Sequence, residues 1–100
     1  MRSISYEEFK QIENDPDVLI IDVRTDMEYK TLPKVPNSIN CEISKLLSNY
    51  QAIVGNDKKR LIVTVCNAGN RSGESAEFLS EKGYNAKVLI GGAYGYSRKK

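Results

Sequence analysis

The sequence predicts an α/β domain of three layers, in which a mostly parallel sheet of about five strands has helices on both faces. Short β-branched and apolar runs, typical of strands buried on both faces, stand at residues 18–21, 61–65 and 87–90. They alternate with stretches that have the apolar spacing and the capping residues of helices. We expect residues 1–100 to form a single domain, because domains commonly contain about 100–150 residues.

The first half of the chain is expected to enter its first helix through a capping box. Ser5 is a suitable N-cap, and Glu8 follows it three residues later. Pro33 and Pro36 interrupt regular structure further on. The elements expected in this half are a strand at 3–5, a helix at 6–14, a strand at 18–21, a short helix within the polar segment 22–29, a strand at 38–41 and a helix at 42–54.

The second half contains the clearest strand, 61–65, which leads directly into Cys66. A helix is expected at 72–82, with Ser72 as its N-cap and Gly83 just after its end. The last expected strand, 87–90, precedes Gly-Gly and a tyrosine-rich end. Ligands of parallel α/β sheets bind at the carboxyl ends of strands, so the segment after the strand 61–65 is the candidate site.

The absence of histidine excludes most catalytic and metal-binding chemistry. Without imidazole there is no Ser-His-Asp triad, no Cys-His pair and no histidine-ligated zinc. The two cysteines, Cys41 and Cys66, form no Cys-x-x-Cys pair and are too few for a structural zinc site. Covalent chemistry would therefore use a single thiol, and we expect no metal and no other cofactor.

Charge and hydropathy limit the partners and the location. The net charge of +2 includes no basic stripe with interleaved aromatic residues, so nucleic-acid binding is not expected. No run approaches the roughly 20 apolar residues that cross a bilayer. The N-terminal residues turn acidic where a signal peptide would become apolar. We expect a cytoplasmic protein with reduced cysteines and no membrane partner.

The segment from Cys66 to Ser72 has the features of an activated thiol. It connects a buried strand to the start of a helix, and Gly69 can adopt backbone angles that other residues rarely take. Such a loop can turn several N–H groups toward its centre and bind an anion there. The helix dipole and the charge of Arg71 would add to this effect. Each factor favours thiolate over thiol, so Cys66 is the candidate nucleophile.

Three motifs in order resemble the rhodanese-like sulfurtransferase domains. The pattern Cys-x-x-Gly-x-Arg-Ser at 66–72 resembles the active-site loop of that family. Asp-Val-Arg at 22–24, followed by Glu28 and Tyr29, resembles its first signature, and Leu-Ile-Gly-Gly at 89–92 resembles its closing signature. In this chain Lys34 stands where the family usually has histidine, and Tyr96 stands where it has tryptophan.

The resemblance implies a sulfurtransferase that works through a persulfide on Cys66. A small anionic donor such as thiosulfate would supply the sulfur, and cyanide, a small thiol or a cysteine of a partner protein would accept it. The residues expected to bind substrate are Asn67, Ala68, Gly69, Asn70, Arg71 and Ser72. Asp22 and Arg24 are expected to brace the strand end, and Arg24 to form a salt bridge with Glu28.

Several alternatives remain open at this point. Arg71 either attracts the anionic donor or only pairs with an acidic residue. Ser72 is expected to act mainly as the N-cap. Cys41 is expected to be a buried core residue. The same fold could serve as a non-catalytic binding or regulatory module, or as a persulfide carrier for a partner enzyme. A Cys-dependent phosphatase or arsenate reductase is disfavoured, because the Cys-x4-Arg loop is one residue shorter than the Cys-x5-Arg of phosphatases.

Overall fold

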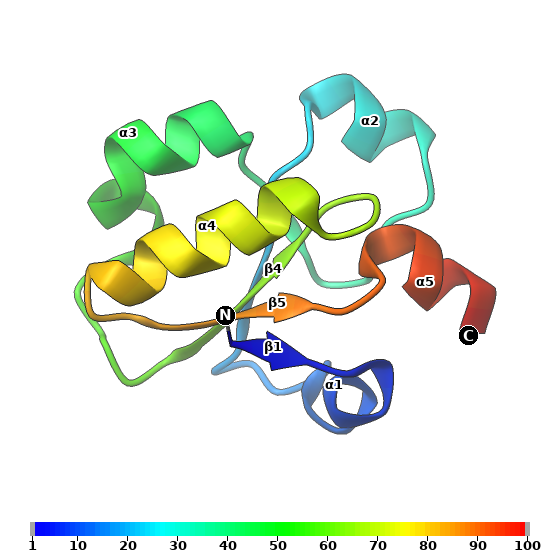
Figure 1. The fold of residues 1–100 in the computed structure, drawn as a ribbon, viewed down its shortest axis with the longest axis horizontal. Helices are drawn as coiled ribbons and strands as arrows, with labels where there is room; N and C mark the ends of the chain where they lie inside the picture. The colour runs from blue at the N-terminus through cyan, green and yellow to red at the C-terminus, as the bar shows by residue number, and fades with distance from the viewer. Residues whose placement is uncertain (1, 100) are drawn as a thin grey trace.

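The computed structural model describes residues 2–99 and contains a five-stranded sheet in which every strand pairing is parallel (Figure 1). The strands are β1 (Ser3–Ile4), β2 (Leu19–Asp22), β3 (Ile39–Asn40), β4 (Leu61–Val65) and β5 (Asn85–Leu89). Their order across the sheet is β1-β5-β4-β2-β3. The central strand β4 therefore has β5 on one side and β2 on the other. The predicted α/β fold is confirmed.

Helices lie on both faces of this sheet. They are α1 (Tyr6–Ile12), α2 (Asp26–Thr31), α3 (Ile43–Val54), α4 (Asn70–Glu81) and α5 (Gly92–Lys99). Figure 1 shows α3 and α4 side by side over one face, and α1 and α5 on the other, with α2 near the start of α4. Among residues 2–99, no helix has the length and apolar character that a membrane crossing requires.

Alternating side chains of the strands divide the core into two clusters. Along β4, Ile62 packs toward one face, whereas Val63 and Val65 pack toward the other. The first cluster includes Leu46 and Val54 of α3 and Ala76 and Leu79 of α4. The second includes Phe9 of α1 and Ala93 and Tyr96 of α5. This pattern explains why the strands read as continuous apolar runs, since both faces are covered.

Two capping boxes fix the helices that follow β1 and β2. The Ser5 hydroxyl accepts from the Glu8 amide, and the Glu8 carboxylate accepts from the Ser5 amide, as the sequence predicted. Thr25 and Glu28 form the same arrangement at the start of α2. The second box places the Glu28 carboxylate at the end of the sheet where Cys66 lies.

The C-terminal part of the chain differs from the prediction. Strand β5 spans Asn85–Leu89 rather than 87–90, and Ile90 lies outside it with 57% of its surface exposed. The tyrosine-rich end, to which the sequence assigned no secondary structure, forms the helix α5. Gly91 and Gly92 adopt positive φ angles of 82° and 61°, which turn the chain back onto the sheet, and Tyr96 then packs into the core.

Tyr96, which replaces the tryptophan of the resembled family, is a structural residue. Its ring contacts Phe9 edge-on at a centroid distance of 6.0 Å, and its hydroxyl donates to Glu13 Oε1 at 2.6 Å. Glu13 is itself buried and also pairs with Lys10. Tyr96 therefore joins α5 to the end of α1 through a polar contact inside an otherwise apolar cluster.

We predict that Tyr96→Phe lowers the free energy of unfolding by about 1–3 kcal/mol, because the buried Glu13 carboxylate loses a donor. Urea unfolding followed by circular dichroism measures the effect. The matched control is Tyr94→Phe on the same helix, where the tyrosine is exposed; this change should stay within about 0.5 kcal/mol. Equal effects of the two substitutions would contradict the role assigned to Tyr96.

Candidate active site

Cys66 lies directly after the central strand β4, at the start of the short loop that leads into α4. Strand β4 ends at Val65, and α4 begins at Asn70 with Gly69 as its N-cap. Gly69 has a φ of 133°, a conformation that side-chain-bearing residues rarely adopt. The Cys66 residue is only 2% exposed. The loop thus holds its sulfur at the N-terminus of α4, as the sequence predicted.

The sulfur of Cys66 accepts hydrogen bonds from groups on the loop and on α4. The Gly69 amide donates to Sγ at 3.0 Å and the Ser72 hydroxyl at 3.2 Å. Burial raises the pKa of the Cys66 thiol, but the Ser72 hydroxyl and the amides of Ser72, Gly69 and Ala68 outweigh burial and bring it below its ordinary value. The geometry therefore favours the thiolate without a basic side chain.

Ser72 is not the N-cap of α4, and this part of the prediction was wrong. The helix begins two residues earlier, at Asn70, because the positive φ of Gly69 turns the chain into helical geometry sooner. Ser72 is consequently buried within the first turn. Its carbonyl accepts from Thr64 Oγ1 at 2.7 Å, while its hydroxyl is directed to the sulfur.

The loop is held from outside by the N-terminus of α5. The Ala93 amide donates to the Cys66 carbonyl at 2.8 Å, and the Tyr94 amide donates to the Asn67 carbonyl at 3.2 Å. A Cβ atom on Gly92 would lie 2.4 Å from the Cys66 carbonyl oxygen, so this approach requires glycine. The closing Gly-Gly signature is therefore a contact of the Cys66 loop, which the sequence did not indicate.

Asp22 and Arg24 form a fully buried ion pair beside the loop. Arg24 Nη2 lies 2.7 Å from Asp22 Oδ2, and both side chains are 0% exposed. Arg24 Nη2 also donates to the Pro33 carbonyl at 3.1 Å, and Nη1 donates to Asn67 Oδ1 at 2.9 Å. The structure therefore places both residues where they brace the end of β2 against the Cys66 loop.

Glu28 pairs with Arg71 rather than with Arg24, which corrects the predicted salt bridge. Arg71 Nη1 and Nη2 donate to Glu28 Oε1 and Oε2 at 2.7 and 3.0 Å. Asn67 Nδ2 donates to Glu28 Oε2 at 3.2 Å. Arg24 is already committed to the buried Asp22 carboxylate, so Glu28 takes the other arginine. The capping box at Thr25 and Glu28 was the sequence signal for the position of this carboxylate.

The predicted substrate-binding residues divide into three groups. Gly69 and Ser72 contact the sulfur through an amide and a hydroxyl. Asn67 and Arg71 direct their side chains to Glu28. Ala68 and Asn70 expose their side chains to solvent. Among residues 2–99, no group of three or more His, Cys, Asp or Glu side chains is arranged to hold a metal ion.

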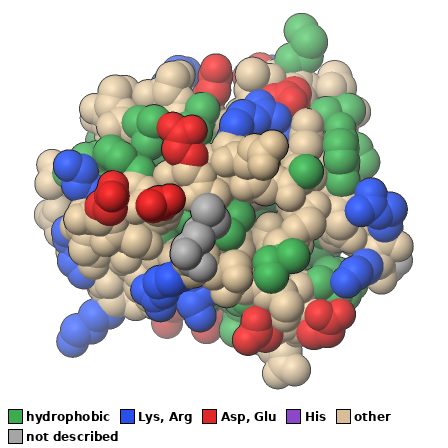
Figure 2. Space-filling model, in the orientation of Figure 1, with side chains coloured by type: hydrophobic (Ala, Val, Ile, Leu, Met, Phe, Trp, Pro, Cys, Tyr) green, Lys and Arg blue, Asp and Glu red, His purple; other side chains and the backbone are tan. Residues whose placement is uncertain are grey.

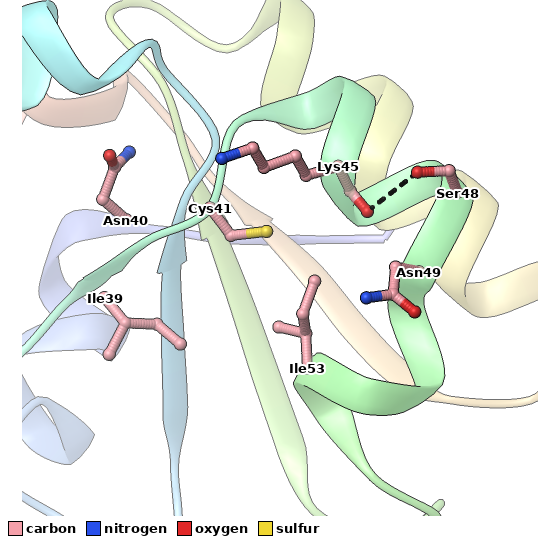
Figure 3. Close-up of a pocket in the computed structure, with 7 residues that line it drawn as sticks. All are labelled: Ile39, Asn40, Cys41, Lys45, Ser48, Asn49 and Ile53. Atoms are coloured by element: carbon pink, nitrogen blue, oxygen red, sulfur yellow. Dashed lines mark hydrogen bonds between the residues drawn. The ribbon is translucent and has the colours of Figure 1, made fainter.

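Cys41 lies at a different place, between β3 and α3. It is half-buried rather than fully buried as expected, and it packs partly against the first core cluster. Its sulfur faces a hollow of about 520 Å³, shown in Figure 3, that Lys45 and Ile53 also line. Burial raises the pKa of the Cys41 thiol, the opposite direction to Cys66. Cys41 is therefore the less reactive of the two cysteines at neutral pH.

Lys34, which replaces the usual histidine of the resembled family, caps the end of α2. Its Nζ donates to the Tyr29 carbonyl at 3.2 Å and lies 4.7 Å from the centroid of the Tyr29 ring. The Tyr29 hydroxyl in turn donates to the Ser38 carbonyl at 2.6 Å. Lys34 thus supports the segment between α2 and β3.

The fold and the site together define an α/β protein in which a cysteine with a lowered pKa lies between the central strand and a helix N-terminus. The rhodanese-like domain family matches residues 5–99, and the chain belongs to this family. A rhodanese domain-containing protein of Drosophila melanogaster is 31% identical, with 90% of each chain covered. The thiosulfate:glutathione sulfurtransferase of Saccharomyces cerevisiae is 30% identical over 93% of this chain and 75% of its own.

A solved structure agrees with this assignment. A rhodanese-related protein from Thermoplasma volcanium superposes with a TM-score of 0.85 at 27% identity, covering 99% of this chain and 93% of that one. The similarity supports a sulfurtransferase-like role for this chain, as do the sulfurtransferases among its relatives.

We predict that Ser72→Ala raises the pKa of Cys66, because the thiolate loses the hydroxyl that donates at 3.2 Å. The thiol should then react with iodoacetamide several times more slowly at neutral pH, and equally fast at high pH. The pH dependence of alkylation measures the shift. Ser75→Ala is the control, since the Ser75 hydroxyl donates to the Arg71 carbonyl at 3.0 Å instead of to the sulfur. An unchanged pH profile in Ser72→Ala would contradict this role.

We predict an acid-sensitive contribution of Glu28 to stability. Arg71 and Thr25 lower the pKa of Glu28 from 4.5 to about 2 in the folded state. A lowered folded-state pKa gives a contribution that is complete above pH 4.5 and disappears as the pH falls toward about 2. The difference in free energy of unfolding between wild type and Glu28→Gln should be constant from pH 5 to 7 and shrink below pH 4.5. A constant difference down to pH 2.5 would contradict the ion pair.

Proposed function

We propose that the protein transfers a sulfane sulfur from thiosulfate or a similar donor to a thiophilic acceptor through a persulfide on Cys66. The observation that carries the proposal is the set of donors around Sγ: the Gly69 amide, the Ser72 hydroxyl and the amides that lower the pKa of the thiol. These groups stabilise a negative sulfur at the end of a buried strand. Such a sulfur is a nucleophile at neutral pH.

The first half-reaction forms the persulfide. The Cys66 thiolate attacks the outer sulfur of thiosulfate and forms a new S–S bond with it. The bond between the two sulfur atoms of thiosulfate breaks. Sulfite leaves with the electron pair of that bond. We expect the N–H and O–H groups that donate to Cys66 Sγ in the free protein to stabilise the negative charge of the persulfide as well.

The second half-reaction returns the enzyme to its starting state. A nucleophilic acceptor attacks the terminal sulfur, and the Cys66 thiolate leaves with the electrons of the S–S bond. Cyanide becomes thiocyanate, and a thiolate becomes a persulfide. Two half-reactions at one thiol predict ping-pong kinetics, and neither half-reaction requires a metal or an organic cofactor.

The name of the yeast relative suggests the class of acceptor. That protein is a thiosulfate:glutathione sulfurtransferase, and it shares 30% identity with this chain. We extend the proposal to a small thiol or a protein cysteine as acceptor. Both cysteines of the chain are free, which fits a reducing compartment such as the cytoplasm.

The geometry gives less support to the alternative functions. A Cys-dependent phosphatase uses its loop arginine to hold the phosphate oxygens. Here the two terminal nitrogens of Arg71, Nη1 and Nη2, donate to the Glu28 carboxylate instead. A binding module has no need of a lowered pKa at Cys66, so activation of the thiol favours catalysis.

We predict that incubation with thiosulfate adds one sulfur to the wild-type protein, and that cyanide then removes it as thiocyanate. Intact-mass spectrometry and a thiocyanate assay measure the two steps. Cys66→Ser should abolish both. Cys41→Ser, the matched control, should retain both, because its thiol lies in the hollow beside α3. The absence of both persulfide and thiocyanate in the wild type would reject thiosulfate as the donor.

A further inference from the structure

The two arginines beside Cys66, Arg24 and Arg71, each form an ion pair with a carboxylate. Arg24 is bound to Asp22 inside the protein. Arg71, half-exposed at the start of α4, is bound through two nitrogens to Glu28 on α2. Each pair has a net charge of zero, so neither arginine presents an uncompensated positive charge to a ligand at Cys66.

Arg71 is the arginine whose charge would otherwise act on a substrate. It precedes Ser72, whose hydroxyl donates to the sulfur. Hydrogen bonding to Glu28 is the main influence that raises the pKa of Arg71, and the negative charge of Cys66 contributes in the same direction. The opposite charge of Glu28, 2.7 Å from the guanidinium, cancels much of the field that Arg71 would exert.

Glu28 is fixed in this position by its other contacts. The Thr25 amide and hydroxyl donate to Oε1 at 3.0 and 3.1 Å, and Asn67 Nδ2 donates to Oε2. With a pKa of about 2, the Glu28 carboxylate is ionised at neutral pH. Figure 2 shows acidic and basic side chains interspersed on the visible face of the molecule.

We propose that Glu28 is a specificity-determining residue: by holding Arg71 it keeps the mouth of the site near zero charge and disfavours dianionic sulfur donors relative to less charged ones. This inference rests on the proposed sulfur transfer for its biological meaning. The site then recognises the reacting sulfur through the loop amides and the Ser72 hydroxyl. Thiosulfate, with two negative charges, then receives no uncompensated positive charge from Arg24 or Arg71 as it approaches the Cys66 thiolate.

The first experiment measures the charge at the site without sulfur chemistry. Iodoacetate and iodoacetamide have similar size and react with the same thiolate, but only iodoacetate is an anion. The ratio of their rates at Cys66, in a Cys41→Ser background, reports the local potential. Glu28→Gln should raise this ratio about threefold at low ionic strength, and added salt should reduce the change.

The matched control is Asp26→Asn, which removes a carboxylate from the same turn of α2. Asp26 pairs with Lys30 at 3.0 Å, and both side chains are largely exposed. The ratio should remain at the wild-type value in this variant. An equal rise in Asp26→Asn and Glu28→Gln would show that overall charge, and not the contact with Arg71, sets the ratio, and would overturn the proposal.

Arg71→Gln provides a second test that does not depend on the folding of Glu28→Gln. This variant leaves Glu28 unpaired, so the ratio should fall below the wild-type value. The double variant Glu28→Gln/Arg71→Gln removes both charges and should return the ratio close to that of the wild type. An unchanged ratio in Arg71→Gln would overturn the proposal, whether or not Glu28→Gln folds.

Sulfur transfer itself forms the last arm of the experiment. For thiosulfate, Glu28→Gln should lower KM and raise kcat/KM about threefold at low salt, with a steeper salt dependence than in the wild type. If no variant forms a persulfide, the proposed function fails while the alkylation ratios still decide the role of Glu28. If the ratios change as expected but kcat/KM does not, Glu28 sets the local charge without controlling donor choice, and the specificity proposal is rejected.

Discussion

The buried guanidinium of Arg24 is the interaction on which the geometry of the site depends. A charge that is 0% exposed is tolerated only when its donors are paired, because an unpaired buried charge costs several kcal/mol. Arg24 meets this requirement by donating to Asp22 at the end of β2, to the Pro33 carbonyl after α2 and to the side chain of Asn67. Arg24 thereby holds the end of β2 and the segment after α2 against the Cys66 loop, which is distant in sequence.

Asn67 transmits this constraint to the exposed side of the site. Its oxygen accepts from Arg24, and its nitrogen donates to Glu28, so one amide connects the buried ion pair to the half-exposed one. Glu28 then holds Arg71, the residue adjacent to Ser72. The loop that surrounds the sulfur is accordingly fixed by polar contacts on one side and by α5 on the other. A rigid set of donors is what stabilisation of a negative sulfur requires.

The sequence was sufficient to predict the fold and the position of Cys66 between β4 and α4, but not the partners of the charged groups. Runs of apolar and β-branched residues such as Leu61–Val65 predict buried parallel strands, because helices cover both faces of such a strand. The ion pair between Arg71 and Glu28, in contrast, depends on how α2 lies against α4, and the local sequence does not specify this arrangement. The prediction that Ser72 is the N-cap was wrong for a related reason. A serine near a helix start is usually the cap, but the positive φ of Gly69 lets α4 begin before Ser72.

The bonds from α5 to the loop have an effect on the direction of the loop peptides. In a trans peptide the carbonyl of one residue and the N–H of the next point in opposite directions, and the described residues contain no cis peptide bond. When Ala93 and Tyr94 bind the carbonyls of Cys66 and Asn67, the N–H groups of Asn67 and Ala68 must therefore point away from α5. The Ala68 N–H is one of the groups that lower the pKa of Cys66. Helix α5 thus contributes to the electrostatics of the site without contacting the sulfur. By binding the loop carbonyls, it orients the loop peptides so that their N–H ends, and not their carbonyl ends, are on the side of the sulfur.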